Sequence, residues 1–498
     1  MQPTTPKRCK ASSAEDLPNE LLTIIFKLVH QLEVFHKESI NLRLTEDPYD
    51  KYWFSCENLT SAARFPNSLA HVCSAWRTIM SSVPSFWTDI VVIVNTSSPV
   101  PFSLPDIQSV LEWTRDLPLN ISVTRRIDSP PLDSFNERKI LVPLINIFSP
   151  QIHRCQSFAF YATHSSALPL IGRDINGSAP LLRELKLECE VDDGTMDIIP
   201  DWSSFSCPSL FNLVINGSNF INITRHDPNW LTNLQDLRWV TFNRLKLPTQ
   251  KDVSRSHVSF LKFIEMLANE DLELEYLRIF DFNPGHYNLD SSEELTIIIL
   301  EISKRLVLED LSDPFVHQFS RTISLYADEL HISKCSLTAM EDIPFTENLK
   351  LEDISPAEDL SISLRKWPGS VLTLSRCLGF NDRVLDMMGD PDVLHDFFDN
   401  SPNNLVKLIL IDCPNFSIEA LKRMLEGRNE DVEDVLRYYG PPAIEGIKVN
   451  GAGPSLSYED VEWFKGRLRY LDWHTEQRDG AVSLVEFDAE EQVTLDLD

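Results

Sequence analysis

The stretch Leu405-Val406-Lys407-Leu408-Ile409-Leu410-Ile411-Asp412-Cys413 decides the fold, because its leucines recur at the spacing L-x-x-L-x-L. In an extended segment alternate side chains point to the same face, so Leu408 and Leu410 face one side while Ile409 and Ile411 face the other. The first leucine precedes the strand at a bend that turns its side chain toward the same side as the other two. The pattern predicts a short strand that buries its leucine face.

The same spacing recurs along the chain, in Leu182-x-x-Leu185-x-Leu187, Leu210-x-x-Leu213-x-Ile215 and Leu234-x-x-Leu237-x-Trp239. Units of this kind cannot bury their apolar face alone, and they stack so that neighbouring strands form a parallel sheet. We therefore expect an α/β fold in which residues 91–485 form an irregular leucine-rich-repeat-like solenoid. Its parallel sheet would have helices or turns on the convex side.

Later copies of the pattern add a cysteine at one fixed offset, at Cys335, Cys377 and Cys413. A small, weakly donating thiol at the bend after a strand fills the interior of a coil, so we expect these cysteines to be buried. One thiol per repeat does not give the close pairs that a zinc site needs, so no metal is predicted. The cysteines lie 42 and 36 residues apart. Leucine-rich repeats usually run to about 20 to 29 residues, which predicts an irregular array with insertions.

Residues between the inward leucines of parallel strands face outward on the concave side, where a solenoid binds its partners. Their mixed charge indicates no particular ligand. The candidate substrate-binding positions are Lys186, Glu188, His331, Ser333, Thr373, Ser375, Ile409 and Ile411.

The amino-terminal segment has a helical sequence pattern instead of the leucine spacing. Leu17-Pro18-x-Glu20-Leu21-x-x-x-Ile25-Phe26 predicts a helix with proline and an acid in its first turn. A second amphipathic helix is predicted over 69–80, and residues 31–66 are expected to be an irregular connector. The polar tail 1–15 and the acidic tail 486–498 are expected to be disordered.

These helical motifs, with Val72-Cys73-x-x-Trp76-Arg77-x-Ile79 and Pro84-x-Phe86-Trp87 after them, resemble an F-box. The version is similar to the F-box-like proteins abundant in mushroom-forming fungi. The resemblance implies an F-box-like domain over 16–90 with an insertion at about 31–66, and this connector is longer than a compact F-box has. It also implies binding to the Skp adaptor of a cullin-RING ligase, through Leu17, Pro18, Leu21, Ile25, Phe26, Val72, Trp76 and Arg77.

A structural interpretation of the same residues stays open. Helical spacing alone does not separate core from interface, so Phe26 and Trp76 are equally well explained as core residues of the helical unit. Pro18 is explained by helix initiation, and Arg77 by a solvated helix face. The alternative function is therefore a leucine-rich protein-binding scaffold with no ligase role.

Composition limits the classes of partner. The chain has 45 Lys and Arg against 75 Asp and Glu, a net charge of −30, which repels phosphate backbones and disfavours nucleic acid. The start lacks an apolar leader, and the aliphatic stretch 295–300, which includes Thr296, is far shorter than the about 20 residues of a membrane span. The nine cysteines contain no CxxC pair. We therefore expect an intracellular protein, in the cytoplasm, the nucleus or both, without membrane contact.

Catalytic signatures are missing from the sequence: it has no GxxxxGK[ST], HExxH, GxSxG or GxGxxG. Its twelve histidines are scattered, with no pair at metal-ligand spacing. These observations predict a non-catalytic protein without a cofactor. The predicted function is the substrate-recognition subunit of an SCF-type cullin-RING ubiquitin ligase, which would bind the Skp adaptor and an unknown protein substrate.

Overall fold

The computed structural model has an α/β architecture built on a large parallel sheet. The chain forms two compact units, unit 1 with residues Met1–Leu187 and Ser203–Cys207, and unit 2 with Glu188–Trp202 and Pro208–Asp498. The structure describes residues 17–43, 65–94, 104–125, 131–193, 202–246, 260–269, 272–283, 297–340, 342–365, 367–390, 404–430, 443–476 and 482–488. The predicted tail 1–15 and most of the predicted tail 486–498 lie outside these residues.

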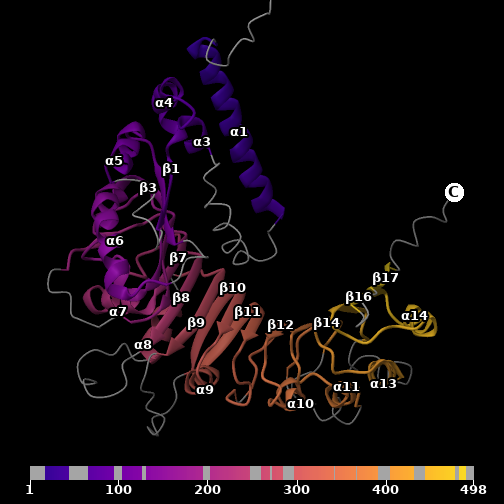
Figure 1. Ribbon diagram of the computed structural model, residues 1–498. Coiled ribbons are helices and arrows are strands. Elements are labelled where there is room, and N and C mark those ends of the chain that lie inside the picture. Colours follow the sequence, from indigo (N-terminus) through magenta and orange to yellow (C-terminus); the bar gives the residue numbers. More distant parts are fainter. Residues whose placement is uncertain are drawn as a thin grey trace, which may run out of the picture. The chain divides into compact units, whose positions relative to one another are not determined.

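Unit 1 begins with helices and continues with alternating strands and helices (Figure 1). Its strands β1, β2, β3 and β5 are neighbours in that order, and β1 with β2 and β2 with β3 pair in parallel. The elements are α1 (Asn19–Arg43), α3 (Asn67–Ala70), α4 (Ser74–Ser81), η2 (Pro84–Phe86), β1 (Asp89–Val94), α5 (Leu104–Trp113), β2 (Leu119–Arg125), α6 (Ser134–Phe148), η3 (Ser149–Arg154), β3 (Cys155–His164), η4 (Ser165–Ala167), β4 (Gly177–Ser178), β5 (Glu184–Val191) and β6 (Phe205–Ser206).

The second predicted helix is in fact two helices. Cys73 has extended backbone, with φ −158° and ψ 169°, and its sulfur accepts a hydrogen bond from the Trp76 N–H at 3.5 Å. It therefore caps α4 and separates it from α3, and the single helix predicted over 69–80 was wrong. Helix α1 also differs from the prediction, because it continues to Arg43 and so occupies part of the expected connector 31–66.

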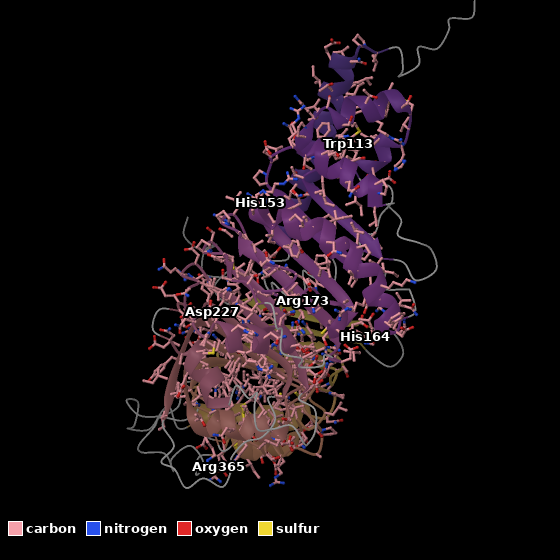
Figure 2. All side chains as sticks on the ribbon, turned by 90° about the vertical axis from the view of Figure 1, so that its left-hand side faces the viewer. Trp113, His153, His164, Arg173, Asp227 and Arg365 are labelled. Carbon is pink, nitrogen blue, oxygen red and sulfur yellow. The ribbon has the colours of Figure 1, made fainter. Side chains whose placement is uncertain are left out.

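The helices of unit 1 share a small aromatic core. Phe86 and Trp87 are buried in it, and the indole N–H of Trp87 donates to the Met80 carbonyl at 3.0 Å. Trp113, labelled in Figure 2, packs on Trp87 with ring centroids 4.7 Å apart. Buried Arg154 donates to the Leu117 carbonyl at 3.1 Å and so fixes the turn that follows α5.

Unit 2 is an ordered array of strands. From β7 to β16 the strands are neighbours in sequence order and each pairs in parallel with the next, whereas β17 pairs antiparallel with β16. The strands are β7 (Asn212–Asn216), β8 (Trp239–Lys246), β9 (Tyr276–Asn283), β10 (Ile298–Glu309), β11 (Ile323–Ser333), β12 (Thr346–Glu352), β13 (Val371–Ser375), β14 (Lys407–Ile411), β15 (Gly446–Gly451), β16 (Tyr470–Glu476) and β17 (Val482–Asp488).

Helices connect many of these strands, and Figure 1 shows α9, α10, α11 and α13 following one another along one side of the array. Each strand with the segment that leads to the next strand is one coil. The helices are α7 (Gly217–His226), α8 (Phe260–Leu267), α9 (Asp313–Thr322), α10 (Leu360–Leu364), α11 (Asp382–Met388), α13 (Ile418–Glu430) and α14 (Tyr458–Lys465). Helix α14 starts after Ser457 with a capping box, in which the Ser457 side chain accepts from the Asp460 N–H and the Asp460 side chain accepts from the Ser457 N–H. Among the described helices, none is both long and apolar enough to cross a membrane.

The inward leucines stack in register from coil to coil. Leu372 pairs with Leu349 and with Leu408, and all three are essentially buried. One predicted copy was out of phase, however. Val240 pairs with Leu213, and Trp239 pairs with Tyr276 in the row one residue earlier. The inward residues at β8 therefore follow the pattern Leu237-x-x-Val240-x-Phe242, and Trp239 does not belong to the buried row.

The prediction that Cys335, Cys377 and Cys413 are buried is confirmed. The thiol of Cys377 lies 3.4 Å from the carbonyls of Leu351 and Ser375, to which it donates. Burial raises the pKa of Cys413 to about 11 and that of Cys335 to about 12, so both stay protonated. The long first interval is explained by Ile354, which follows β12 at the equivalent place and is buried there. The 42 residues thus span two coils.

A residue in the left-handed region follows the same register position in successive coils. The sheet pairs Glu309 with Ser333, Ser333 with Glu352, and Glu352 with Ser375. The residue after each of these strand positions has a φ between 51° and 53°. The Lys334 N–H donates to the Glu352 carbonyl and the Asp353 N–H to the Ser375 carbonyl, both at 3.0 Å, so the backbone hydrogen bonds of the sheet continue past the strand end. The left-handed ladder consists of Arg244, Asp281, Asp310, Lys334, Asp353, Arg376, Asp412 and Gly451.

Two positions of this ladder should respond oppositely to substitution. Gly451 has φ 75°, and a Cβ there would lie 2.0 Å from Asp412 Oδ1, so Gly451→Ala should lower the free energy of unfolding by about 1 to 3 kcal/mol. Lys334→Gly should leave it unchanged or raise it by up to about 1 kcal/mol, because relief of left-handed strain offsets the entropy that glycine adds to the unfolded chain. Urea unfolding of both variants checks this; a loss of stability in Lys334→Gly as large as in Gly451→Ala would contradict it.

Candidate functional site

Helix α1 exposes an apolar stripe along one side. Five of its side chains, counted from Leu21, lie at positions i, i+3, i+4, i+7 and i+11, which share one face of a helix with 3.6 residues per turn, and Leu17 precedes the first turn. Ile24 and Leu28 are each 54% exposed, and Leu32 is 68% exposed. We call this surface the α1 stripe: Leu17, Leu21, Ile24, Ile25, Leu28 and Leu32.

The opposite side of α1 holds the helix in the core of unit 1. Leu22 is 4% exposed and Phe26 1%, and both pack with Ala70, Ile79 and Met80. The rings of Phe26 and Trp76 meet edge to face, with centroids 5.0 Å apart. These contacts fix the rotation of α1, and they turn the stripe toward solvent.

The structure divides the residues that the F-box resemblance singled out. Phe26 is buried and Trp76 half-buried in the core, so their role there is structural. Arg77 donates from Nε to the Ala70 carbonyl at 3.3 Å, which links α4 to α3. The remaining residues are exposed, namely Leu17, Pro18, Leu21, Ile25 and Val72.

The candidate substrate-binding residues of unit 2 lie in two rows of the sheet, on the face opposite the leucines. His331, Thr373 and Ile409 share one row, in which Lys350 stands between the first two. Ser333, Ser375 and Ile411 share the other, in which Glu352 stands between the two serines. The predicted common face is thereby confirmed for β11, β13 and β14.

Access to these residues is uneven. His331, Ser333 and Ser375 are at most 8% exposed, whereas Thr373, Ile409 and Ile411 are half-buried. On β5, Lys186 is 3% exposed and its ammonium lies 2.5 Å from the Glu184 carboxylate, while Glu188 is half-buried. The buried members are therefore poor contact residues for a large partner.

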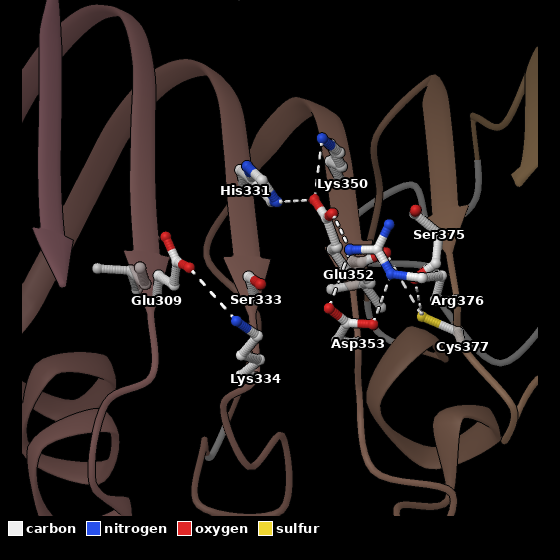
Figure 3. Close-up of polar contacts among 12 residues, drawn as sticks. Glu309, His331, Ser333, Lys334, Lys350, Glu352, Asp353, Ser375, Arg376 and Cys377 are labelled. Carbon is white, nitrogen blue, oxygen red and sulfur yellow. Dashed lines mark hydrogen bonds and ion pairs between the residues drawn. The ribbon is translucent and has the colours of Figure 1, made fainter. Parts of the chain in front are cut away.

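Glu352 organises the polar centre of this face (Figure 3). One carboxylate oxygen lies 2.9 Å from His331 Nε2 and 3.0 Å from Lys350 Nζ. The other oxygen accepts from Arg376, which also contacts Asp353 at 2.7 Å. The sequence did not single out Glu352, Lys350 or Arg376, because the cluster joins residues of neighbouring coils. Their proximity becomes visible only once the strands are aligned in register.

These contacts lower the pKa of two carboxyl groups. The contact with His331, followed by the charge of Lys350, holds the pKa of Glu352 far below its ordinary value, although burial opposes the shift. Arg376 likewise lowers the pKa of Asp353. The carboxylates of Glu352 and Asp353 are thus ionised at neutral pH and lie beside the cationic side chains of Lys350 and Arg376. Its geometry stabilises adjacent coils, and among the described residues no group of His, Cys, Asp or Glu side chains is placed to hold a metal ion.

Replacing Glu352 by Gln should lower the free energy of unfolding at pH 7 by about 1 to 3 kcal/mol, because charge-assisted hydrogen bonds are lost in a half-buried place. The folded pKa is depressed, so the contribution of Glu352 is complete above its unfolded pKa of about 4.3 and declines as the pH falls below that. The gap between wild type and Glu352→Gln should therefore narrow below about pH 4.

Glu347→Gln is the matched control for this prediction, since Glu347 is an exposed carboxylate on the same strand. It should change stability by less than about 0.5 kcal/mol at either pH. Denaturant unfolding at pH 7 and pH 3.5 measures both variants, and a pH-independent gap for Glu352→Gln would contradict the assigned role.

Comparison with known proteins adds no relative to this geometry: no protein-family model matches the chain, and no curated protein is significantly similar to it.

Proposed function

We propose that the protein is the substrate-recognition subunit of an SCF-type cullin-RING ubiquitin ligase. In this proposal the α1 stripe binds the Skp adaptor, and the sheet of unit 2, as a leucine-rich-repeat-like solenoid, binds a protein substrate. The protein is a non-catalytic adaptor that acts inside the cell, in the cytoplasm or the nucleus.

The observation that carries the proposal is the exposure of the α1 stripe. A helix of a globular protein normally turns its apolar side chains to the core and its polar ones to water. Here Leu21 is 47% and Ile25 43% exposed, while a second apolar set on the same helix makes the core contacts. A contiguous exposed apolar surface of this kind commonly marks a protein interface, and a helix face suits a groove on a partner.

The F-box resemblance supplies the identity of that partner. Leu17, Leu21 and Ile25 are both motif residues and members of the exposed stripe, so the residues that resemblance assigns to adaptor contact are available for it. Phe26 and Trp76 support the surface from beneath. This division agrees with an adaptor-binding helix whose rotation is set by its own small core.

The proposed contribution to ubiquitin transfer is proximity. Holding a substrate near a charged conjugating enzyme raises its effective concentration, and this requires no proton transfer or covalent step from the receptor. The cysteine thiols agree with this role, since burial keeps those of Cys335 and Cys413 protonated and thus poor nucleophiles.

Placing charges on the stripe should abolish adaptor binding without unfolding the chain. In Leu21→Asp, Ile25→Asp the carboxylates occupy exposed positions, so the fold should persist while capture of the Skp adaptor falls at least about tenfold. Phe135→Asp is the control, because Phe135 is 76% exposed on α6 of the same unit. Quantitative pull-down with purified Skp adaptor, and circular dichroism of each variant, provide the measurement.

Equal capture by the wild type and the double variant would overturn the assigned surface. No capture by the wild type would favour the alternative of a leucine-rich binding scaffold without a ligase role, in which the helices of unit 1 serve structure alone. Phe26→Ala is unsuitable for this test, because truncating a buried aromatic costs about 3 to 5 kcal/mol of stability by itself.

A further inference from the structure

Strands β10 and β11 extend beyond their neighbours at their amino-terminal ends. Residues 298–302 of β10 pair in register with 323–327 of β11. On the other sides, β9 reaches β10 only from Arg305 onward, and β12 begins opposite Ala327. The two segments therefore form a projecting parallel ribbon, here called the β10–β11 ribbon.

One face of the ribbon packs on the core and the other is apolar as well. Leu300, Ile302 and Leu325 are at most 4% exposed, as the alternation of a half-buried strand requires. Ile299 is 54% and Tyr326 57% exposed on the opposite face. Further exposed apolar side chains continue this surface at the two ends of the ribbon, at Ile297 and Phe345.

The surroundings of this apolar face are acidic. Glu301 pairs in register with Tyr326, and Asp328 lies two residues farther along β11. Both carboxylates are exposed, and within the described ranges neither has a cation at ion-pair distance. The nearby cations are already engaged, since Lys304 lies 2.6 Å from Glu275 and Arg305 lies 2.9 Å from Glu329. The ribbon thus combines apolar contacts with uncompensated negative charge.

The ribbon also offers backbone hydrogen-bonding groups. The last contact of β10 with the segment before β9 is the Ser303 N–H, which donates to the Leu274 carbonyl at 2.9 Å. Beyond it, no strand in the described part of the chain pairs with the outer edge of residues 298–302. A strand edge with free N–H and C=O groups is a template for a further strand, and alternate side chains of the added strand then give specificity.

We propose that the outer edge of β10 binds an extended segment of a partner protein that carries apolar residues along one face, followed on the same face by lysine or arginine. The segment adds as a strand beside 298–302, places apolar side chains against Ile297 and Ile299, and places a basic side chain beside Glu301. A second copy of this chain fits poorly, because each copy carries a net charge of −30. The site goes beyond the ligase proposal and does not depend on it.

Binding of two synthetic peptides to the full chain tests this site. A fluorescent decapeptide that carries valines and then lysines at alternate positions, with threonine at the positions between them, should bind. Its counterpart with glutamate in place of lysine should bind at least about tenfold more weakly, by charge complementarity. Fluorescence anisotropy gives both affinities. Raising the salt concentration should weaken the lysine peptide, because the contact with Glu301 is exposed to screening.

Charge reversal at one exposed position should reverse the preference between the two peptides. Glu301→Lys should lower the affinity for the lysine peptide and raise the affinity for the glutamate peptide, each by roughly fivefold or more. Asp236→Lys makes the same change of net charge in an exposed turn before β8, and it should leave both affinities within about twofold. Ile299→Thr keeps a β-branched residue in the strand but removes apolar contact, so it should weaken the lysine peptide at least about threefold. Its control is Ile362→Thr, since Ile362 is 68% exposed on α10.

Three outcomes would overturn the proposal. Equal effects of Glu301→Lys and Asp236→Lys would show a nonspecific response to net charge. Self-association that Ile299→Thr abolishes, seen by sedimentation, would assign the edge to a second copy. No binding of either peptide would leave the edge without the proposed occupant. Because these measurements use no ligase component, their failure is distinct from a failure to capture the Skp adaptor.

Discussion

In unit 2 the constraint on which the rest depends is parallel pairing in one register. Once Leu349, Leu372 and Leu408 lie in one buried row, every other residue of those strands has an assigned face and an assigned row. The chain must then leave each strand at the same place. The left-handed residues there supply that turn, and Asp, Arg and Lys tolerate it because their N–H groups continue the ladder of hydrogen bonds. The strain of a left-handed residue is thus offset by a satisfied backbone donor.

The same register brings charges from separate coils together. Because Glu352 stands between Ser333 and Ser375 in its row, it meets the imidazole of His331 on β11, and it meets Lys350 on β12 and Arg376 in the turn after β13. Desolvation makes a half-buried carboxylate costly alone, so its partners offset the cost of placing it between stacked coils. The outward face is therefore largely neutralised from within. A face of this kind suits recognition by shape and hydrogen bonding, whereas the β10–β11 ribbon retains acidic charge that no described cation balances.

The leucine spacing was sufficient to predict the parallel sheet, the common face of the strands and the burial of Cys335, Cys377 and Cys413. The prediction failed in one copy of the pattern, where two adjacent residues are both apolar. Trp239 satisfied the spacing after Leu237, although Val240 occupies the buried row, because periodicity cannot distinguish two adjacent phases when both offer apolar residues. Burial of His331 and Ser375 also escaped prediction, since it depends on the long side chains of neighbouring coils. The ribbon escaped for the same reason: the apolar run that ends at Leu300 is visible in the sequence, but the shorter reach of β9 is not.

Helix α1 shows a second limit of prediction from the periodicity of apolar residues. Its sequence contains two apolar stripes, and nothing in their spacing says which of them packs. The decision comes from distant residues, because Ala70, Ile79, Met80 and Phe86 form a hollow that accepts the pair Leu22 and Phe26 at i and i+4. An aromatic ring that fills such a hollow gains more from burial than a leucine does, so the stripe that contains Phe26 turns inward and the wholly aliphatic stripe turns outward. The exposed surface is thus a consequence of core packing, and a substitution in the core would disturb it indirectly, through the rotation of the helix.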